Sequence, residues 1–274
     1  MTALGGHRVF VLRQGSEGPT ILLLHGFPSS SYDWRALLEC GPMRDRDVLA
    51  FDFLGFGLAD KPHVPNSLLR QADLVEELVA RYTGGRVFLV AHDMGTSVAT
   101  ELFARELDGR ASISLSAALL FNGSMLLHLA HPTIGQRLLM SRAGPLVSRL
   151  GSERVFRQQL GSVFSQAHPL SAEEAADQWS LVTERGGHRR GHDLIAYQRE
   201  RIRYRDRWHG AIRDWGGHLE LLWGMRDPVA GTAVLRGLQA LRPGMAVTEL
   251  GDLGHYPQIE DPERVASVIA ATAR

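Results

Sequence analysis

Asp93 is the residue of this chain best placed for covalent chemistry. Residues 87–91 read Val-Phe-Leu-Val-Ala, a buried-strand pattern, and lead directly into residues 92–95, His-Asp-Met-Gly. A strand that turns sharply into a helix has room only for small residues around its apex, and Ala91 and Gly95 fill those places. A carboxylate at this apex predicts attack on an sp3 carbon to give an alkyl-enzyme ester. The alternative interpretation is an ordinary helix-capping aspartate.

An acid and a histidine follow Asp93 in the order that a catalytic triad requires. Asp227 comes after a predicted strand at 219–223, and His255 comes after one at 245–250. Each lies on a loop between a strand and a helix, so a parallel sheet would bring the three side chains together. Taken singly, the two later residues are also explained as a turn aspartate and a loop histidine. Their joint order favours catalysis.

Two backbone N–H groups are predicted to form an oxyanion hole. The turn at residues 25–28, His-Gly-Phe-Pro, follows the apolar strand 20–24. The N–H of Phe27 would point into the same crevice as the N–H of Met94. A plain strand-to-helix loop is the alternative. Ser97 is a poor nucleophile candidate, because it lies four residues into the predicted helix with no sharp turn around it.

These residues need a mostly parallel sheet to position them. Strand-like runs alternate with helix-length segments, and their continuous apolar character predicts strands buried on both faces. The predicted strands span 7–12, 20–24, 48–51, 86–90, 115–121, 219–223 and 245–250. The predicted helices span 31–38, 68–81, 96–107, 230–240 and 262–271. The fold class is therefore α/β, with a doubly wound sheet.

Residues 123–217 interrupt this alternation and are predicted to be an inserted helical cap. The segment has amphipathic stretches at 172–183 and 193–208 and no clear strand. Open α/β sheets bind ligands over the carboxyl ends of their strands, so an insertion there would cover the site. The expected α/β core then comprises residues 1–122 and 218–274.

Composition narrows the class of ligand. The 274 residues are 44% apolar, enough for one large core, and carry 30 basic and 30 acidic side chains. This balance favours a small uncharged substrate and predicts no nucleic-acid or membrane partner. The lone Cys40 excludes an intramolecular disulfide, and residues 1–13 lack a signal-peptide core, so a cytoplasmic monomer or homodimer is expected. No residue cluster has metal-ligand spacing, and we expect neither metal nor cofactor.

Five motifs relate the chain to a known family. They are His-Gly-Phe-Pro-Ser-Ser-Ser-Tyr-Asp-Trp at 25–34, Asp-Phe-Leu-Gly-Phe-Gly at 52–57 with Asp-Lys-Pro at 60–62, His-Asp-Met-Gly at 92–95, Asp-Pro-Val at 227–229 and His-Tyr-Pro-Gln-Ile-Glu-Asp-Pro at 255–262. Together they resemble the α/β-hydrolase superfamily, in its epoxide hydrolase and haloalkane dehalogenase branch, and most closely the mesoderm-specific transcript protein-like hydrolases. The resemblance implies the α/β-hydrolase fold but no settled reaction.

Met94 and Phe27 decide between the two reactions of this branch. Dehalogenases resembling this chain place a tryptophan after the nucleophile and an asparagine or second tryptophan elsewhere, to donate N–H to the halide. Neither Met94 nor Phe27 has a donor side chain, so a departing halide would be poorly stabilised. Fluoroacetate-type enzymes carry an arginine after the nucleophile, and Met94 replaces that too. The two residues therefore favour epoxide opening.

Epoxide opening needs an acid above Asp93, which related epoxide hydrolases supply from cap tyrosines. The predicted cap has two, Tyr197 and Tyr204, which would share one face of a continuous helix. We expect Tyr197 to be the acid and Tyr204 to bind substrate, with His131 or His128 as the second polar group. The alternative is that both tyrosines pack the cap onto the core.

The expected reaction has two steps. Asp93 attacks the epoxide while Tyr197 donates to its oxygen, and water activated by His255 and Asp227 then releases a vicinal diol. Two alternatives use the same fold: a haloalkane dehalogenase with the same nucleophile, or a non-catalytic ligand-binding protein. Asn122 is expected only to orient its neighbours.

Two further expectations concern side chains outside the triad. His92 is expected to pack behind the nucleophile, with its ring directed away from the crevice. The alternating arginines at 199, 201, 203, 205 and 207 are expected to form a solvated face of the cap.

Overall fold

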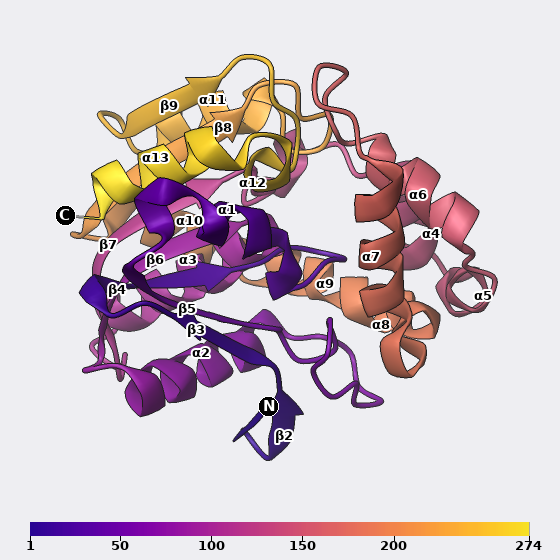
Figure 1. The fold of residues 1–274 in the computed structure, drawn as a ribbon, viewed down its shortest axis with the longest axis horizontal. Helices are drawn as coiled ribbons and strands as arrows, with labels where there is room; N and C mark the ends of the chain where they lie inside the picture. Colours follow the sequence, from indigo (N-terminus) through magenta and orange to yellow (C-terminus); the bar gives the residue numbers. More distant parts are fainter. Residues whose placement is uncertain (274) are drawn as a thin grey trace.

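The computed structural model describes residues 1–273, and a seven-stranded sheet forms its centre (Figure 1). The strand order is β3-β5-β4-β6-β7-β8-β9. The strands are β3 (Val11–Gln14), β4 (Glu17–Leu24), β5 (Arg46–Phe51), β6 (Arg86–His92), β7 (Ser114–Phe121), β8 (His218–Gly224) and β9 (Ala246–Leu250). Only β3 runs antiparallel to its neighbour, so the predicted α/β class with a mostly parallel sheet is confirmed.

The prediction of one strand over residues 7–12 was wrong. The structure divides it into β2 (His7–Val9), which pairs with β1 (Thr2–Leu4), and β3, which joins the main sheet. The chain leaves the small hairpin and enters the sheet at Phe10, and it cannot pair in both places as one strand.

Helices cover both faces of the sheet. The helices of the core are α1 (Arg35–Glu39), α2 (Leu68–Tyr82), α3 (Met94–Leu107), α11 (Thr232–Leu241), α12 (Pro257–Glu260) and α13 (Pro262–Thr272). Alternate residues of β6 enter different apolar clusters: Leu89 packs on the face of α2 and α3, whereas Phe88 and Val90 pack on the face of α1 and α13. Both faces of β6 are therefore buried, as its continuous apolar run predicts.

The segment between β7 and β8, residues 122–217, is helical, and we call it the cap. It contains α4 (Ile134–Met140), α5 (Gly144–Arg149), α6 (Glu153–Gly161), α7 (Ala172–Thr183), α8 (Gly191–Leu194), α9 (Gln198–Arg203) and α10 (Arg205–Asp214). Figure 1 shows α4 to α8 gathered on the side of the molecule away from the C-terminus. Within residues 1–273, no helix is both long and apolar enough to cross a membrane.

The predicted helix 193–208 is interrupted, which separates the two cap tyrosines. Tyr197 ends a short 3-10 segment, and Tyr204 has dihedral angles of φ −105° and ψ 14° at the junction of α9 and α10. Because the helix is broken between them, the two rings do not share a helical face.

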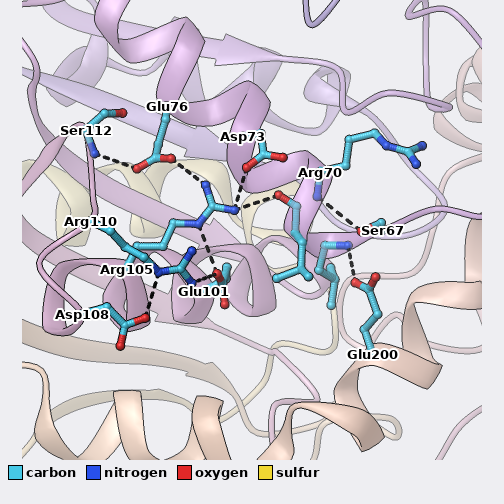
Figure 2. Close-up of polar contacts among 12 residues, drawn as sticks. Ser67, Arg70, Asp73, Glu76, Glu101, Arg105, Asp108, Arg110, Ser112 and Glu200 are labelled. Atoms are coloured by element: carbon cyan, nitrogen blue, oxygen red, sulfur yellow. Dashed lines mark hydrogen bonds and ion pairs between the residues drawn. The ribbon is translucent and has the colours of Figure 1, made fainter.

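A buried ionic cluster fixes α3, the helix that begins directly after Asp93. Figure 2 shows the Arg105 guanidinium among Asp73, Glu76 and Glu101, at distances of 2.7, 2.6 and 3.1 Å. Glu101 is fully buried and also accepts the indole N–H of Trp208 in α10 at 2.8 Å. A buried carboxylate with several donors is well satisfied, so α3 is tied to both α2 and α10.

Candidate active site

Asp93 lies at the apex of a sharp turn between β6 and α3. Its backbone has φ 43° and ψ −109°, a conformation that L-residues rarely adopt and that is common at functional sites. The end of β4 crowds this turn: a methyl group at Gly95 would lie 2.7 Å from the carbonyl oxygen of Leu24, and one at Gly26 would lie 2.8 Å from the Asp93 Cβ. Glycine at these two positions permits the close approach.

His255 and Asp227 meet at the carboxyl ends of β9 and β8. His255 Nδ1 lies 2.7 Å from Asp227 Oδ2, and both residues are at most 5% exposed. Asp227 also accepts the N–H of Val229 at 2.7 Å and the amide of Asn122 at 2.9 Å. Asn122 therefore orients the carboxylate. Burial would raise the pKa of Asp227, but the charge of His255 and these hydrogen bonds hold it below its usual value.

Three carboxylates act on His255. Burial lowers its pKa, yet the charges of Asp227, Asp93 and Glu260, with the hydrogen bond to Asp227, outweigh burial and raise the pKa to about 9. His255 is thus an imidazolium at neutral pH.

The N–H of Phe27 points at the carboxylate of Asp93. Phe27 N donates to Asp93 Oδ2 at 2.8 Å. Met94, the second predicted donor, is the first residue of α3, and its buried side chain accepts the amide of Asn66 at 3.3 Å through sulfur. The structure thus brings Asp93 and Phe27 together, with Met94 at the helix start beside them.

His92 lies behind Asp93 and supports the loop that carries His255. It is fully buried, and its Nε2 lies 2.7 Å from the carbonyl oxygen of His255. The carbonyl can only accept, so Nε2 carries the proton, and Nδ1 accepts from the amide of Gln258 at 3.1 Å. Burial lowers the pKa of His92 to about 3, which keeps it neutral.

Arg201 is a site residue that sequence reasoning missed. The expected solvated arginine face is wrong for this position, since Arg201 is only 3% exposed. Its Nε donates to Ser97 Oγ at 2.8 Å, and its Nη2 lies 3.4 Å from the carbonyl oxygen of Asp93 and 4.0 Å from its carboxylate. In the short helix α9, Arg201 points inward. The alternation of charges in the sequence does not show which arginine does so.

Tyr197 is buried close to these groups. Its ring centroid lies 6.2 Å from that of Phe27, and the Arg201 guanidinium lies 4.9 Å from the Tyr197 ring. The hydroxyl accepts from the side chain of Gln198 at 3.5 Å, and within residues 1–273 it donates to no protein atom. Burial and the charge of Asp93 raise the pKa of Tyr197, so the hydroxyl keeps its proton at neutral pH.

A cavity of about 200 Å³ lies between the cap and the sheet. Phe27, His255 and Tyr256 line its inner end, and the other walls come mainly from the cap. Asp93 and Tyr197 are buried beside the inner end, at 4% and 1% exposure, and are not among its lining residues.

The other two predicted substrate-binding residues do not border this cavity. Tyr204 packs its ring 5.5 Å from that of Trp208, and His131 is exposed. By contrast Tyr256, which we did not predict, lines the cavity and donates its hydroxyl to the carbonyl oxygen of Phe27 at 3.2 Å. Its position next to His255 was the available signal. No group of three or more potential ligand residues in the described chain could hold a metal ion.

Comparison with known proteins identifies the family. Residues 21–268 match the model of the Alpha/beta hydrolase family. The chain belongs to this family. It is similar to "Putative hydrolase LipZ" of Mycobacterium tuberculosis, with 51% identity over 97% of this chain and 91% of that protein. It is also similar to the mesoderm-specific transcript homolog protein of Homo sapiens, with 35% identity over 88% of this chain and 75% of that protein.

Solved structures agree on the fold of this alpha/beta hydrolase. A loop variant of the haloalkane dehalogenase DbeA from Bradyrhizobium elkanii superposes with a TM-score of 0.78, covering 99% of this chain and 94% of that one. Its sequence identity is 21%, so this likeness concerns the fold alone. The chain is accordingly a hydrolase by family, and the predicted resemblance to the mesoderm-specific transcript-like members is confirmed.

Proposed function

We propose that this hydrolase opens epoxides through an alkyl-enzyme ester on Asp93. The observation that carries the proposal is the buried Tyr197 hydroxyl, whose proton has no protein acceptor among the described residues and which lies in the field of the Asp93 carboxylate. An epoxide oxygen stays attached to the substrate when the ring opens and needs such a donor. Tyr197 is the acid in this proposal.

The first step forms one bond and breaks one. A carboxylate oxygen of Asp93 attacks an epoxide carbon, the C–O bond of the ring breaks, and the resulting alkoxide takes the proton of Tyr197. The product is a hydroxyalkyl ester, and no atom leaves the substrate. The tyrosinate next to Arg201 is stabilised by the cation until it is reprotonated from solvent.

The second step, hydrolysis of the ester, depends on the loss of the Asp93 charge in the first step. Esterification removes the negative charge of Asp93, one of the groups that raise the pKa of His255. His255 then gives its proton to solvent more readily. The neutral imidazole accepts a proton from water, and Asp227 holds the imidazolium that forms. Hydroxide attacks the ester carbonyl, the Phe27 N–H stabilises the oxyanion, and the diol leaves with Asp93 restored.

A haloalkane dehalogenase is the second candidate. The same nucleophile, base and acid would serve, and the fold of DbeA is shared. However, the side chain of Asn66, the amide beside Met94, already donates to the Met94 sulfur and to the carbonyl oxygen of Leu194. Both of its N–H groups are committed, and the side chain of Phe27 has no N–H, so a halide would lack the paired side-chain donors that its departure needs.

The test accumulates the alkyl-enzyme ester and measures its mass. The His255→Gln variant is incubated with epoxides and haloalkanes, and intact mass spectrometry follows the protein. We expect a gain equal to the whole mass of an epoxide, located at Asp93 by peptide mapping. A haloalkane adduct lacks the halogen, so the two reactions differ in mass. The His255→Gln, Asp93→Asn double variant is the control and should stay unmodified.

Adducts from haloalkanes alone would support the dehalogenase. Absence of any adduct, with an inactive wild-type protein, would make the chain a ligand-binding member of its family. For the acid, Tyr197→Phe should slow ester formation by about 100-fold, within the range of general acid catalysis. Tyr204→Phe is the matched control. Equal rates in the two variants would exclude Tyr197 as the acid.

A further inference from the structure

The outer helices of the cap expose an unusual number of large apolar side chains. Those on and beside α4, α5 and α6 are between 38% and 71% exposed. They are Ile134, Leu138, Met140, Leu146, Leu150 and Val155. Six of the ten strongly exposed large apolar residues of the described chain thus fall within 22 consecutive positions. Single exposed leucines are ordinary, but several on consecutive helices, of which α4 and α5 are in contact, make this part of the cap a candidate interaction surface.

Unpaired arginines lie among these apolar residues. They are Arg137, Arg142, Arg149, Arg154 and Arg157, all of them exposed. Within the described residues 1–273, none forms an ion pair with a carboxylate. Glu153 is the only acid between 134 and 161, so this stretch carries a charge of +4 and the rest of the neutral chain −4. We call these six apolar and five basic residues the cap patch.

The cap patch lies beside the cavity. The same three helices supply part of the cavity wall, through Leu139 of α4, Val147 of α5 and Phe156 of α6. Val155 belongs to both, since it lines the cavity and is 54% exposed. Figure 1 shows α4, α5 and α6 together on the outer side of the cap, with α7 and α8 between them and the sheet. Val155 therefore connects the cap patch with the wall of the cavity.

We propose that the cap patch docks on an anionic lipid surface. Short amphipathic helices that combine exposed leucines with arginines bind at the boundary between head groups and acyl chains. The apolar side chains enter the boundary, and each arginine near it gains from the negative surface potential. The absence of carboxylate partners leaves all five arginines free for phosphate groups. Docking brings the cavity to the lipid, so an apolar substrate dissolved in the bilayer reaches it without crossing water.

A second copy of the chain fits this surface poorly. In a symmetric dimer the same patch meets itself, so ten arginines would face each other with only two glutamates between them. Like charges brought together in this way oppose association. The same arginines that oppose a second copy attract anionic lipid. The net charge of the whole chain is zero, so the local positive charge of the cap patch is not evident from composition.

Flotation with lipid vesicles tests the proposal, using the full chain. The vesicles contain phosphatidylglycerol and phosphatidylcholine in one sample and phosphatidylcholine alone in the other. We expect binding to the anionic vesicles only, and binding that weakens as salt rises because the charges are screened. This readout does not depend on the reaction at Asp93, so it can fail or succeed independently of the proposed function.

Matched variants separate the two components of the cap patch. Arg149→Gln with Arg154→Gln should weaken binding by about 30-fold, while Arg86→Gln with Arg199→Gln, two exposed arginines elsewhere, should leave it unchanged. Leu146→Ser with Leu150→Ser should weaken binding as well. The single control Ile202→Ser removes an exposed apolar side chain outside the patch. All these side chains are exposed, so thermal unfolding should confirm that each variant folds.

Several outcomes would overturn the proposal. One is no binding of the wild-type chain to anionic vesicles, and another is equal binding by the patch and control variants. A third is a concentration-dependent dimer in sedimentation that Leu146→Ser with Leu150→Ser abolishes. That result would show that the surface binds a second copy of the chain. Binding to an acidic protein without any binding to the vesicles would assign it to a protein partner instead.

Discussion

Arg201 places its Nη2 atom 4.0 Å from the Oδ1 atom of Asp93, and both residues are almost completely buried. Within the described chain, Asp93 is the only carboxylate at ion-pair distance from this arginine. Esterification of Asp93 would therefore leave a buried cation without its anion. Such a charge is costly, so the arrangement destabilises the ester relative to the free carboxylate and favours its hydrolysis.

A double-mutant cycle of Asp93→Asn and Arg201→Gln should reveal this coupling. Replacing a buried active-site carboxylate often raises the free energy of unfolding. Asp93→Asn should not do so, because it removes the anion paired with Arg201. We expect a coupling free energy of unfolding of about 0.5–3 kcal/mol, measured by denaturant titration of the four proteins. Arg199→Gln, an exposed arginine of the same helix, replaces Arg201→Gln in the control cycle and should show no coupling. A coupling near zero for Arg201 as well would contradict the pairing.

The protonation of His255 should follow the charge of Asp93. The pKa of His255 is raised to about 9 by the carboxylates of Asp227, Asp93 and Glu260, in decreasing order of effect. Asp93→Asn removes one negative charge and should lower the pKa, as measured by NMR titration of the imidazole nitrogens. Glu249→Gln, a partly exposed carboxylate paired with Arg236, should leave the titration unchanged. An unaltered pKa in Asp93→Asn would mean that esterification cannot prepare His255 as a base.

Much of the fold, and the meeting of Asp227 with His255, could be predicted because both depend on local sequence. Apolar runs such as residues 21–24 are long enough to identify buried strands, and parallel strands bring their carboxyl ends to one edge. Chain order alone then indicates that Asp227 and His255 approach each other, and the structure places them 2.7 Å apart. The turn at Asp93 could likewise be predicted, because only small residues fit around its apex.

The cap could not be predicted to the same depth because its side-chain directions depend on helix breaks. The amphipathic run 193–208 reads as one helix, yet the breaks at Tyr197 and Tyr204 turn Arg201 inward and leave Tyr204 away from the cavity. A pattern of alternating arginines carries no information about which one lies beside Asp93. Tertiary contacts between α9 and α3 decide that, and a single sequence does not contain them.

Removal of the Asn122 amide should slow ester hydrolysis more than ester formation. The side chain donates to Asp227 Oδ2 and bonds both backbone groups of Gly224 in β8. Asn122→Gly is the suitable change, because the backbone φ of 49° would strain other residues. Loss of a hydrogen bond to a charged group predicts about a tenfold decrease in hydrolysis, measured by single-turnover mass spectrometry. An equal decrease in both steps would indicate general disruption rather than loss of Asp227 orientation.

The buried carboxyl of Asp33 should make stability fall as the pH rises. Asp33 is fully buried at the contact between core and cap, where Ser29 and the Gln178 amide of α7 donate to it, and burial raises its pKa to about 7. Between its unfolded value near 4 and pH 7 the folded state binds more protons, so the free energy of unfolding decreases with pH. Asp33→Asn should therefore gain stability over the wild-type protein at pH 8 and lose that advantage near pH 4, as followed by urea denaturation. Asp60→Asn is the control of opposite sign, because the pKa of Asp60 is lowered by the N–H and the charge of Arg8. A parallel pH dependence in the Asp33 variant and the wild-type protein would show that the carboxyl is not buried as described.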